Sequence, residues 1–170
     1  MPMPMPAPIT PQEGQESVWN YPRPPAIEKV AKRLRWCYQG QIVAETRQAY
    51  RILETSHPPV YYFPIEDVQQ RFFKPQSERS FCEWKGNAQY WDLIHPRTQK
   101  VLHAKIAWSY PHPTPRFAAL KNAFAFYLRS DCTGYVDHIQ VTPQPGEFYG
   151  GWITPDIVGP FKGEPGSWDW

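Results

Sequence analysis

The stretch ETSHPPVYYFPIEDV, residues 54–68, concentrates the features that decide the fold and the site of this chain. Its proline pair, Pro58-Pro59, holds φ at about −65° and forces the preceding residue into extended geometry. His57 therefore stands on a stiff bend, where its imidazole is positioned in advance for binding or for proton transfer. After the bend, the β-branched and aromatic residues 60–63 predict a short strand.

Turn and strand patterns on both sides of this stretch predict a mainly-β domain. Residues 34–38 and 41–44 flank Gln39-Gly40, which suits a tight hairpin turn because glycine tolerates positive φ. Residues 88–94 and 101–110 flank a second turn rich in strand-breaking residues. Further strands are expected at residues 50–54, 124–128 and 135–141, and short helices or helical lead-ins at residues 28–35, 64–67 and 114–121.

Composition divides the chain into three parts. Residues 1–26 alternate proline with small or polar residues and predict a flexible, polyproline-like arm. Residues 27–142 contain the strand patterns and are expected to form one domain. Residues 143–170 are rich in glycine, proline and aromatic rings, which a disordered tail rarely carries. We expect this extension to pack on the domain or on a second copy of the chain, as a homodimer contact.

Charge, hydropathy and cysteine content argue against several classes of protein. The 170 residues have a formal net charge of only +2 and no long basic run, so we expect no nucleic-acid partner. No apolar run approaches the roughly 18 to 20 residues of a membrane span, and no signal-peptide pattern is present, which predicts a soluble, cytoplasmic protein without membrane contact. Cys37, Cys82 and Cys132 lie far apart and form no C-x-x-C pair. This spacing argues against disulfides and structural zinc, so neither a metal nor a cofactor is predicted.

Several separate motifs, in a fixed order, carry a resemblance to a known family. They are Leu53-Glu54, His57 through Pro64, Asp67-Val68, Cys82 with Lys85-Gly86, Tyr90-Trp91, Ala107 through Pro111, and Ala125-Phe126-Tyr127. Over roughly residues 34–140 the chain resembles the DUF427 family of small bacterial proteins, and from about Phe148 onward it resembles an extension of the cyanobacterial members. The resemblance implies a β-tent fold similar to the Mss4-like proteins, with two antiparallel sheets that meet at an angle.

Two properties associated with this scaffold do not match the sequence. Many β-tent relatives hold zinc with two C-x-x-C pairs, and this chain has none. The family also carries a label that suggests nucleotidyl transfer. The chain has neither a Gly-rich phosphate loop nor an Asp-x-Asp pair that would hold magnesium and a triphosphate. The sequence therefore argues against both properties.

The candidate catalytic residues surround the rigid bend. Glu54 precedes His57 by three residues, so its carboxylate can orient the imidazole for general acid/base catalysis. Cys82 is the candidate nucleophile because the nearby Lys85 ammonium would stabilise a thiolate, although a buried, inert thiol is the simpler interpretation. The predicted ligand-binding residues are Tyr61, Tyr62, Asp67, Lys85, Gly86, Trp108 and Tyr110.

Three functions fit these residues. The leading prediction is a pocket for a small polar or aromatic molecule around the Glu54-His57-Pro58-Pro59 bend, because tyrosine and tryptophan rings stack on planar ligands while their polar ends bond to them. The second is an enzyme that uses His57 as general acid or base, with Cys82 as a candidate nucleophile. The third is a structural or protein-interaction module that engages a partner through its arm and its extension.

Overall fold

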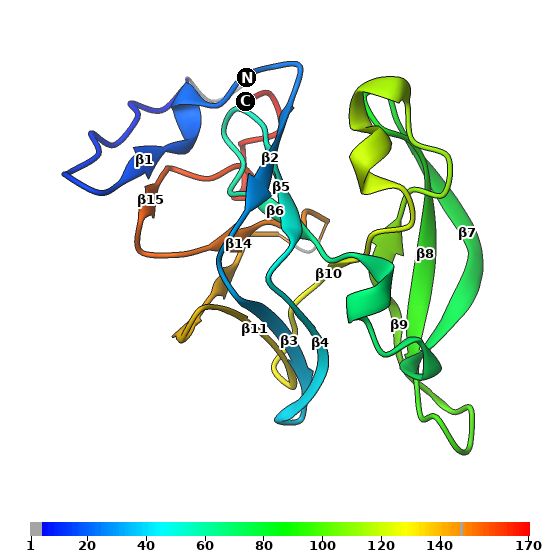
Figure 1. Cartoon of the computed structure of the whole chain (residues 1–170). Helices are drawn as coiled ribbons and strands as arrows, with labels where there is room; N and C mark the ends of the chain where they lie inside the picture. The colour runs from blue at the N-terminus through cyan, green and yellow to red at the C-terminus, as the bar shows by residue number, and fades with distance from the viewer. Residues whose placement is uncertain (1–4, 147) are drawn as a thin grey trace.

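The computed structural model describes residues 5–146 and 148–170 and confirms the predicted mainly-β class (Figure 1). The helices in the described residues are short 3₁₀ segments, and none of them is long and apolar enough to cross a membrane. They are η1 (Val18–Asn20), η2 (Ile65–Asp67), η3 (Gln70–Phe72) and η4 (Pro115–Leu120). The strands are β1 (Glu16–Ser17), β2 (Ala26–Val30), β3 (Leu34–Tyr38), β4 (Gln41–Thr46), β5 (Ala49–Leu53), β6 (Val60–Tyr62), β7 (Phe73–Cys82), β8 (Gly86–Ile94), β9 (Val101–Ser109), β10 (Ala125–Phe126), β11 (Cys132–Val136), β12 (Ile139–Gln140), β13 (Thr142–Pro143), β14 (Trp152–Ile153) and β15 (Ile157–Val158).

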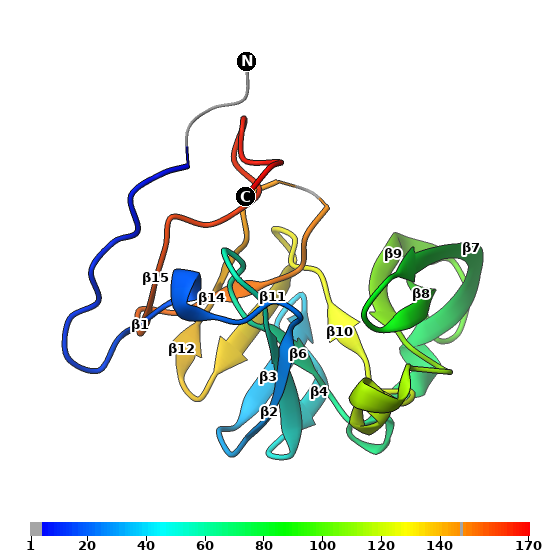
Figure 2. The same ribbon diagram turned by 90° about the horizontal axis from the view of Figure 1, so that it is seen from above.

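Antiparallel sheets form two halves of the molecule. One half is the sheet β10-β9-β8-β7, and the other contains β12-β11-β3-β4 and the smaller sheet β2-β5-β6. Figure 2 shows these halves on opposite sides of the molecule. Phe63 and Phe124 join them, because their backbones exchange hydrogen bonds of 2.7 and 2.8 Å where β6 ends and β10 begins. This bridge connects the two halves through their backbones.

The turn and the packing of the β3-β4 hairpin follow from its sequence. Gln39 and Gly40 have φ values of 47° and 78°, the positive values that a two-residue hairpin turn requires. Trp36 of β3 is fully buried and stacks on Phe126 of β10, with 4.6 Å between ring centroids. This strand therefore presents its large apolar side chain to the core that the two halves share.

Local structure differs from the sequence-based predictions in several places. The predicted single strand at residues 135–141 is a hairpin, because β11 ends at Val136 and β12 pairs back on it. The predicted helical lead-in at residues 28–35 is extended, because β2 pairs with β5 and buries Val30 against the core. The long strand β7 was not predicted, since most of its side chains are exposed and polar and give little apolar alternation. The segment after Thr114 does turn helically, but as the 3₁₀ helix η4.

Part of the proline-rich arm packs on the domain. β1 pairs in parallel with β15, and Val18 is fully buried. An ion pair stabilises this contact, because the Arg51 guanidinium lies 2.6 Å from Glu16 Oε1 of β1. The same guanidinium lies 2.8 Å from Glu28 Oε1 of β2. Composition does not predict this packing, because the apolar residues of the arm, such as Val18, are scattered among prolines and polar residues and form no strand or helix pattern.

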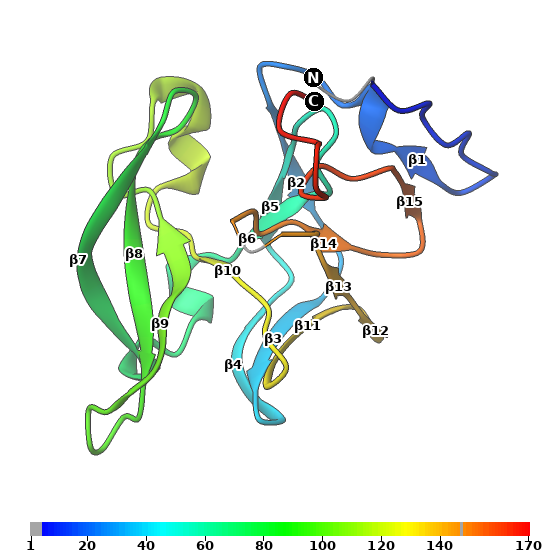
Figure 3. The ribbon, with the colours of Figure 1, turned by 180° about the vertical axis from the view of Figure 1, so that it is seen from behind.

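The described residues of the extension, 143–146 and 148–170, pack on the domain of the same chain (Figure 3). Trp152 of β14 is fully buried, and its ring centroid lies 5.6 Å from that of Tyr61. The Trp152 backbone N–H donates to the Pro59 carbonyl at 2.8 Å, and its indole N–H donates to the Phe126 carbonyl at 3.1 Å. These contacts hold the extension against the proline bend.

Candidate functional site

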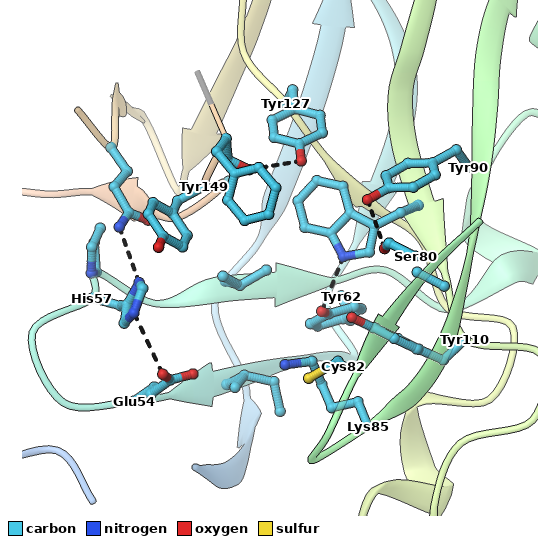
Figure 4. A pocket seen from close by; sticks show the side chains of 18 of the residues that line it. Glu54, His57, Tyr62, Ser80, Cys82, Lys85, Tyr90, Tyr110, Tyr127 and Tyr149 are labelled. Carbon is cyan, nitrogen blue, oxygen red and sulfur yellow. Dashed lines mark hydrogen bonds and ion pairs between the residues drawn. The ribbon is translucent and has the colours of Figure 1, made fainter. Parts of the chain in front are cut away.

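A pocket of about 320 Å³ lies where the two halves and the extension meet (Figure 4). The first wall comes from the end of β5, the bend and β6. The second wall comes from β7, β8 and β9, and the third from the extension. Most of the predicted site residues line this pocket, namely Glu54, His57, Tyr62, Cys82, Lys85, Trp108 and Tyr110.

The other three predicted residues, Tyr61, Asp67 and Gly86, do not line this pocket. Tyr61 points to the opposite face of β6 from Tyr62 and packs in the core against Trp152. Asp67 lies in η2, where its carboxylate accepts a hydrogen bond of 2.7 Å from the Thr46 hydroxyl. Gly86 begins β8 with φ of 105°, and a Cβ there would lie 3.1 Å from the His112 carbonyl oxygen. Glycine is needed at this position for the backbone path.

A tight turn positions the acid and the imidazole on the same side of the bend. The His57 N–H donates to the Glu54 carbonyl at 3.0 Å, and Ser56 adopts a left-handed φ of 71°. This geometry brings Glu54 Oε2 to 3.4 Å from His57 Nε2. Arg23 lies on the other side of the carboxylate, with 3.5 Å between Nη2 and Oε2. Glu54 is therefore held between a guanidinium and an imidazole.

Gln144 of the extension determines which nitrogen of His57 carries the proton. The Gly151 N–H donates to Gln144 Oε1 at 3.1 Å, which orients the side-chain amide. Gln144 Nε2 then donates to the Lys162 carbonyl at 2.8 Å and to His57 Nδ1 at 3.0 Å. Because Nδ1 accepts this bond, the neutral ring carries its proton on Nε2, which faces Glu54.

His57 is neutral and engaged on both sides. Burial, together with the nearby positive charges of Lys162, Arg23 and Lys85, lowers the pKa of His57 to about 3. A general base needs an accessible lone pair, and the Nδ1 lone pair is occupied by the Gln144 amide. The arrangement suits a rigid polar link better than a catalytic base.

Lys85 places a positive charge inside the pocket. The residue is 9% exposed, and Nζ lies 5.7 Å from the centroid of the Tyr110 ring. Burial lowers the pKa of the ammonium, but Tyr62, Cys82 and Glu54 outweigh this effect, and the pKa is raised overall. Among the described residues, no carboxylate oxygen lies within 4.0 Å of Nζ. The pocket therefore contains a charged amine without a close counter-charge.

Aromatic rings form much of the remaining wall. The Trp108 indole N–H donates to the Tyr62 hydroxyl at 3.2 Å, and the Tyr127 ring centroid lies 4.5 Å from that of Trp108. Gly150 of the extension lies directly against Trp108, since a Cβ at this position would overlap the indole ring. These contacts fix the rings and leave flat apolar faces beside polar hydroxyl groups.

Several pocket residues were not predicted to belong to the site. Five of them come from the extension, namely Gln144, Phe148, Tyr149, Gly150 and Lys162. Ser80 and Tyr90 face each other across β7 and β8, with 2.8 Å between their hydroxyl oxygens. The only signal for the extension was its density of large rings, which predicts packing but does not show what it covers.

The cysteines occupy different environments. Cys82 lines the pocket beside Lys85 (Figure 4), whereas Cys37 and Cys132 are buried elsewhere. Burial raises the pKa of the Cys37 thiol. The zinc site of β-tent relatives does not fit these residues, because the chain has no C-x-x-C pair.

A comparison with protein families matches most of the chain. The model described as a domain of unknown function (DUF427) matches residues 26–142. No curated protein matches the chain. The match includes the first two walls of the pocket and ends before Gln144, Tyr149 and Lys162. The pocket is thus built from the matched domain and from residues that follow it.

Proposed function

Since the chain belongs to the DUF427 family, whose function is unknown, we propose a function from the pocket itself. The pocket binds a small planar molecule that carries a negatively charged group. The observation that carries this proposal is the buried Lys85 ammonium, which has no carboxylate within 4.0 Å among the described residues. Burying an ammonium is costly unless an opposite charge or several acceptors compensate it. Glu54 favours the charged ammonium from more than 4.0 Å away, so none of the described carboxylates pairs with Nζ directly, and a bound anion can do so.

The walls favour a planar partner for this anion. Trp108, Tyr62 and Tyr110 are buried around the pocket and held by contacts with one another. Such rings stack on a flat ligand, and their polar ends give direction to its hydrogen bonds. The volume of about 320 Å³ lies at the lower end of the usual range for small-molecule sites, about 300 to 1,000 Å³. A ligand with one or two rings matches this space.

The geometry favours binding over acid/base catalysis. The Nδ1 lone pair of His57 accepts from Gln144, and Nε2 faces Glu54, so neither nitrogen is free to receive a substrate proton. A catalytic role would require the Gln144 contact to break first. In this proposal His57 and Glu54 are instead fixed polar groups in the pocket wall.

Matched acids and amides test the proposal because they differ mainly in charge. We would measure the melting temperature of the full chain with benzoate and indole-3-carboxylate, and with benzamide and indole-3-carboxamide as their neutral counterparts. The variants are Lys85→Met, which keeps the unbranched side chain up to the ammonium, and Lys100→Met, which removes an exposed lysine on the β8-β9 turn.

The expected result is a concentration-dependent rise in melting temperature with at least one acid and a smaller rise with its amide. Lys85→Met should abolish the difference between acid and amide, and Lys100→Met should preserve it. The proposal is wrong if acids and amides stabilise the wild-type protein equally, or if Lys85→Met responds to the acids as the wild type does.

A further inference from the structure

A cluster of metal-ligating side chains lies outside the pocket. It consists of His103 in β9, Asp131 in the turn before β11, and Cys132 at the start of β11. One donor atom from each residue lies within 4.8 Å of the other two. His103 Nε2 is 2.8 Å from Asp131 Oδ1, and Cys132 Sγ is 3.6 Å from the same oxygen. A nitrogen, an oxygen and a sulfur donor therefore converge on one point.

We propose that His103, Asp131 and Cys132 bind one Zn²⁺ ion. Zinc bonds of about 2.0 to 2.3 Å to nitrogen, oxygen and sulfur place tetrahedral donors roughly 3.2 to 3.8 Å apart. The His103–Asp131 and Cys132–Asp131 donor separations would change by about half an ångström or less to reach this range. The His103 and Cys132 donor atoms lie within 4.8 Å of each other, and a separation above this range would have to shorten. This donor set differs from paired C-x-x-C motifs, and its long sequence separation explains why spacing along the chain does not reveal it.

The backbone holds two of the donors in place before any ion binds. The Gln39 N–H donates to the Asp131 carbonyl at 2.8 Å, and Cys132 pairs with Tyr38 in the β11-β3 ladder. Arg129 and Cys132 close the turn with backbone hydrogen bonds of 2.9 and 3.1 Å. His103 Nε2 already lies 2.8 Å from Asp131 Oδ1 of this preformed pair.

Charge and exposure fit a divalent ion. One thiolate and one carboxylate balance the two positive charges, and a neutral imidazole adds none. Cys132 is fully buried, whereas the His103 and Asp131 side chains are 25% and 34% exposed. Solvent can therefore supply a water molecule as the fourth ligand. Arg129 is the nearby cation, and its guanidinium donates to the Leu128 carbonyl and lies over the Tyr127 ring.

Binding must release protons in a defined way. The Cys132 thiol loses its proton to solvent as the sulfur–zinc bond forms. The His103 Nε2–Asp131 contact gives way to a bond from each atom to the ion, and the neutral imidazole carries its proton on Nδ1. The ion would link β9 of one half to β11 of the other. We therefore expect zinc to stabilise the fold as well as to bind.

Cobalt provides a direct test because a cobalt–thiolate bond has a charge-transfer absorption in the near ultraviolet. The full chain would be treated with a chelator, dialysed, and titrated with Co²⁺ and then Zn²⁺. The variants are Cys132→Ser and His103→Gln. Cys82→Ser and His138→Gln are the matched controls, since Cys82 lies in the pocket and His138 is exposed.

The expected result is one Co²⁺ per chain with thiolate absorption that Zn²⁺ displaces. Cys132→Ser should lose the absorption, His103→Gln should weaken binding by at least about tenfold, and both controls should behave as the wild type does. If Cys132→Ser does not fold, His103→Gln and the zinc-dependent melting temperature decide the question. The proposal is overturned if the wild type shows no thiolate absorption, or if only Cys82→Ser removes it.

Discussion

Gln144 and His57 are joined by a hydrogen bond of 3.0 Å, although 87 residues separate them in the sequence. Gln144 belongs to the extension, and His57 stands on the proline bend of the family domain. The bond fixes the proton of His57 on Nε2 and fastens the extension over the pocket. The extension and the bend therefore act as one structural unit.

The neutral state of His57 predicts a specific pH dependence of stability. Its pKa in the folded protein, about 3, lies below the 6.5 of an unperturbed histidine, so the unfolded chain binds the proton first as the pH falls. The stabilisation is complete above pH 6.5 and is lost toward pH 3, with a contribution of up to about 5 kcal/mol. Urea unfolding between pH 4 and pH 7 measures this loss.

The control for this prediction is His57→Gln, which cannot titrate. The unfolding free energy of this variant should fall less steeply between pH 7 and pH 4 than that of the wild type. Nitrogen-15 NMR of the wild type should show a neutral ring with its proton on Nε2 throughout this range. A midpoint near pH 6.5 for His57 would contradict the account.

Removing the Gln144 side chain should loosen the extension. Gln144→Ala leaves the Gly151 N–H, the Lys162 carbonyl and His57 Nδ1 without their partner in a buried place. We expect a loss of at least about 2 kcal/mol in the free energy of unfolding. Hydrogen exchange should also become faster in residues 148–165. Gln140→Ala, at an exposed position of β12, should leave both measurements unchanged.

A methyl group at Gly150 should separate the extension from the indole of Trp108. The added Cβ of Gly150→Ala would overlap the ring, and overpacking of this kind costs about 1 to 3 kcal/mol. Trp108→Phe removes the overlapping atoms. The double variant should therefore be less destabilised than the sum of the two single variants, as measured by urea unfolding. Simple additivity would show that the two residues do not touch.

The three cysteines should differ in their reactivity. Cys82 lines the pocket and is partly exposed, whereas Cys37 and Cys132 are buried. Iodoacetamide should modify Cys82 in the folded protein and the other two only after unfolding. Peptide mass spectrometry after a short reaction checks this order. Equal modification of Cys37 and Cys82 in the folded state would show that Cys82 is no more accessible than a buried cysteine, which contradicts its position in the pocket wall.

Local sequence signals predicted the parts of the fold that depend on local chemistry. The Gln39-Gly40 turn and the strands beside it follow from backbone preferences and alternation. The polar strand β7 and the packed segment near Val18 do not, because their positions depend on partners far away in the sequence. Tertiary pairing outweighs weak local propensity in both places.

The candidate site was predictable only where its residues are close in sequence. Glu54 and His57 share one turn, and Cys82 and Lys85 share another, so each pair was visible as a motif. The role of Gln144 was not visible, because a glutamine in a Gly/Pro-rich segment has no pattern that points to a distant histidine. The convergence of His103 with Asp131 was hidden for the same reason.

The position of a bound acid in the pocket decides whether Lys85 holds the ligand. The measurement is a crystal structure of the full chain with benzoate or indole-3-carboxylate, whichever raises the melting temperature more. We expect a carboxylate oxygen within hydrogen-bonding distance of Lys85 Nζ, with the ring against Trp108 or Tyr110. An acid bound with its carboxylate away from Lys85, or bound outside the pocket, would contradict this expectation.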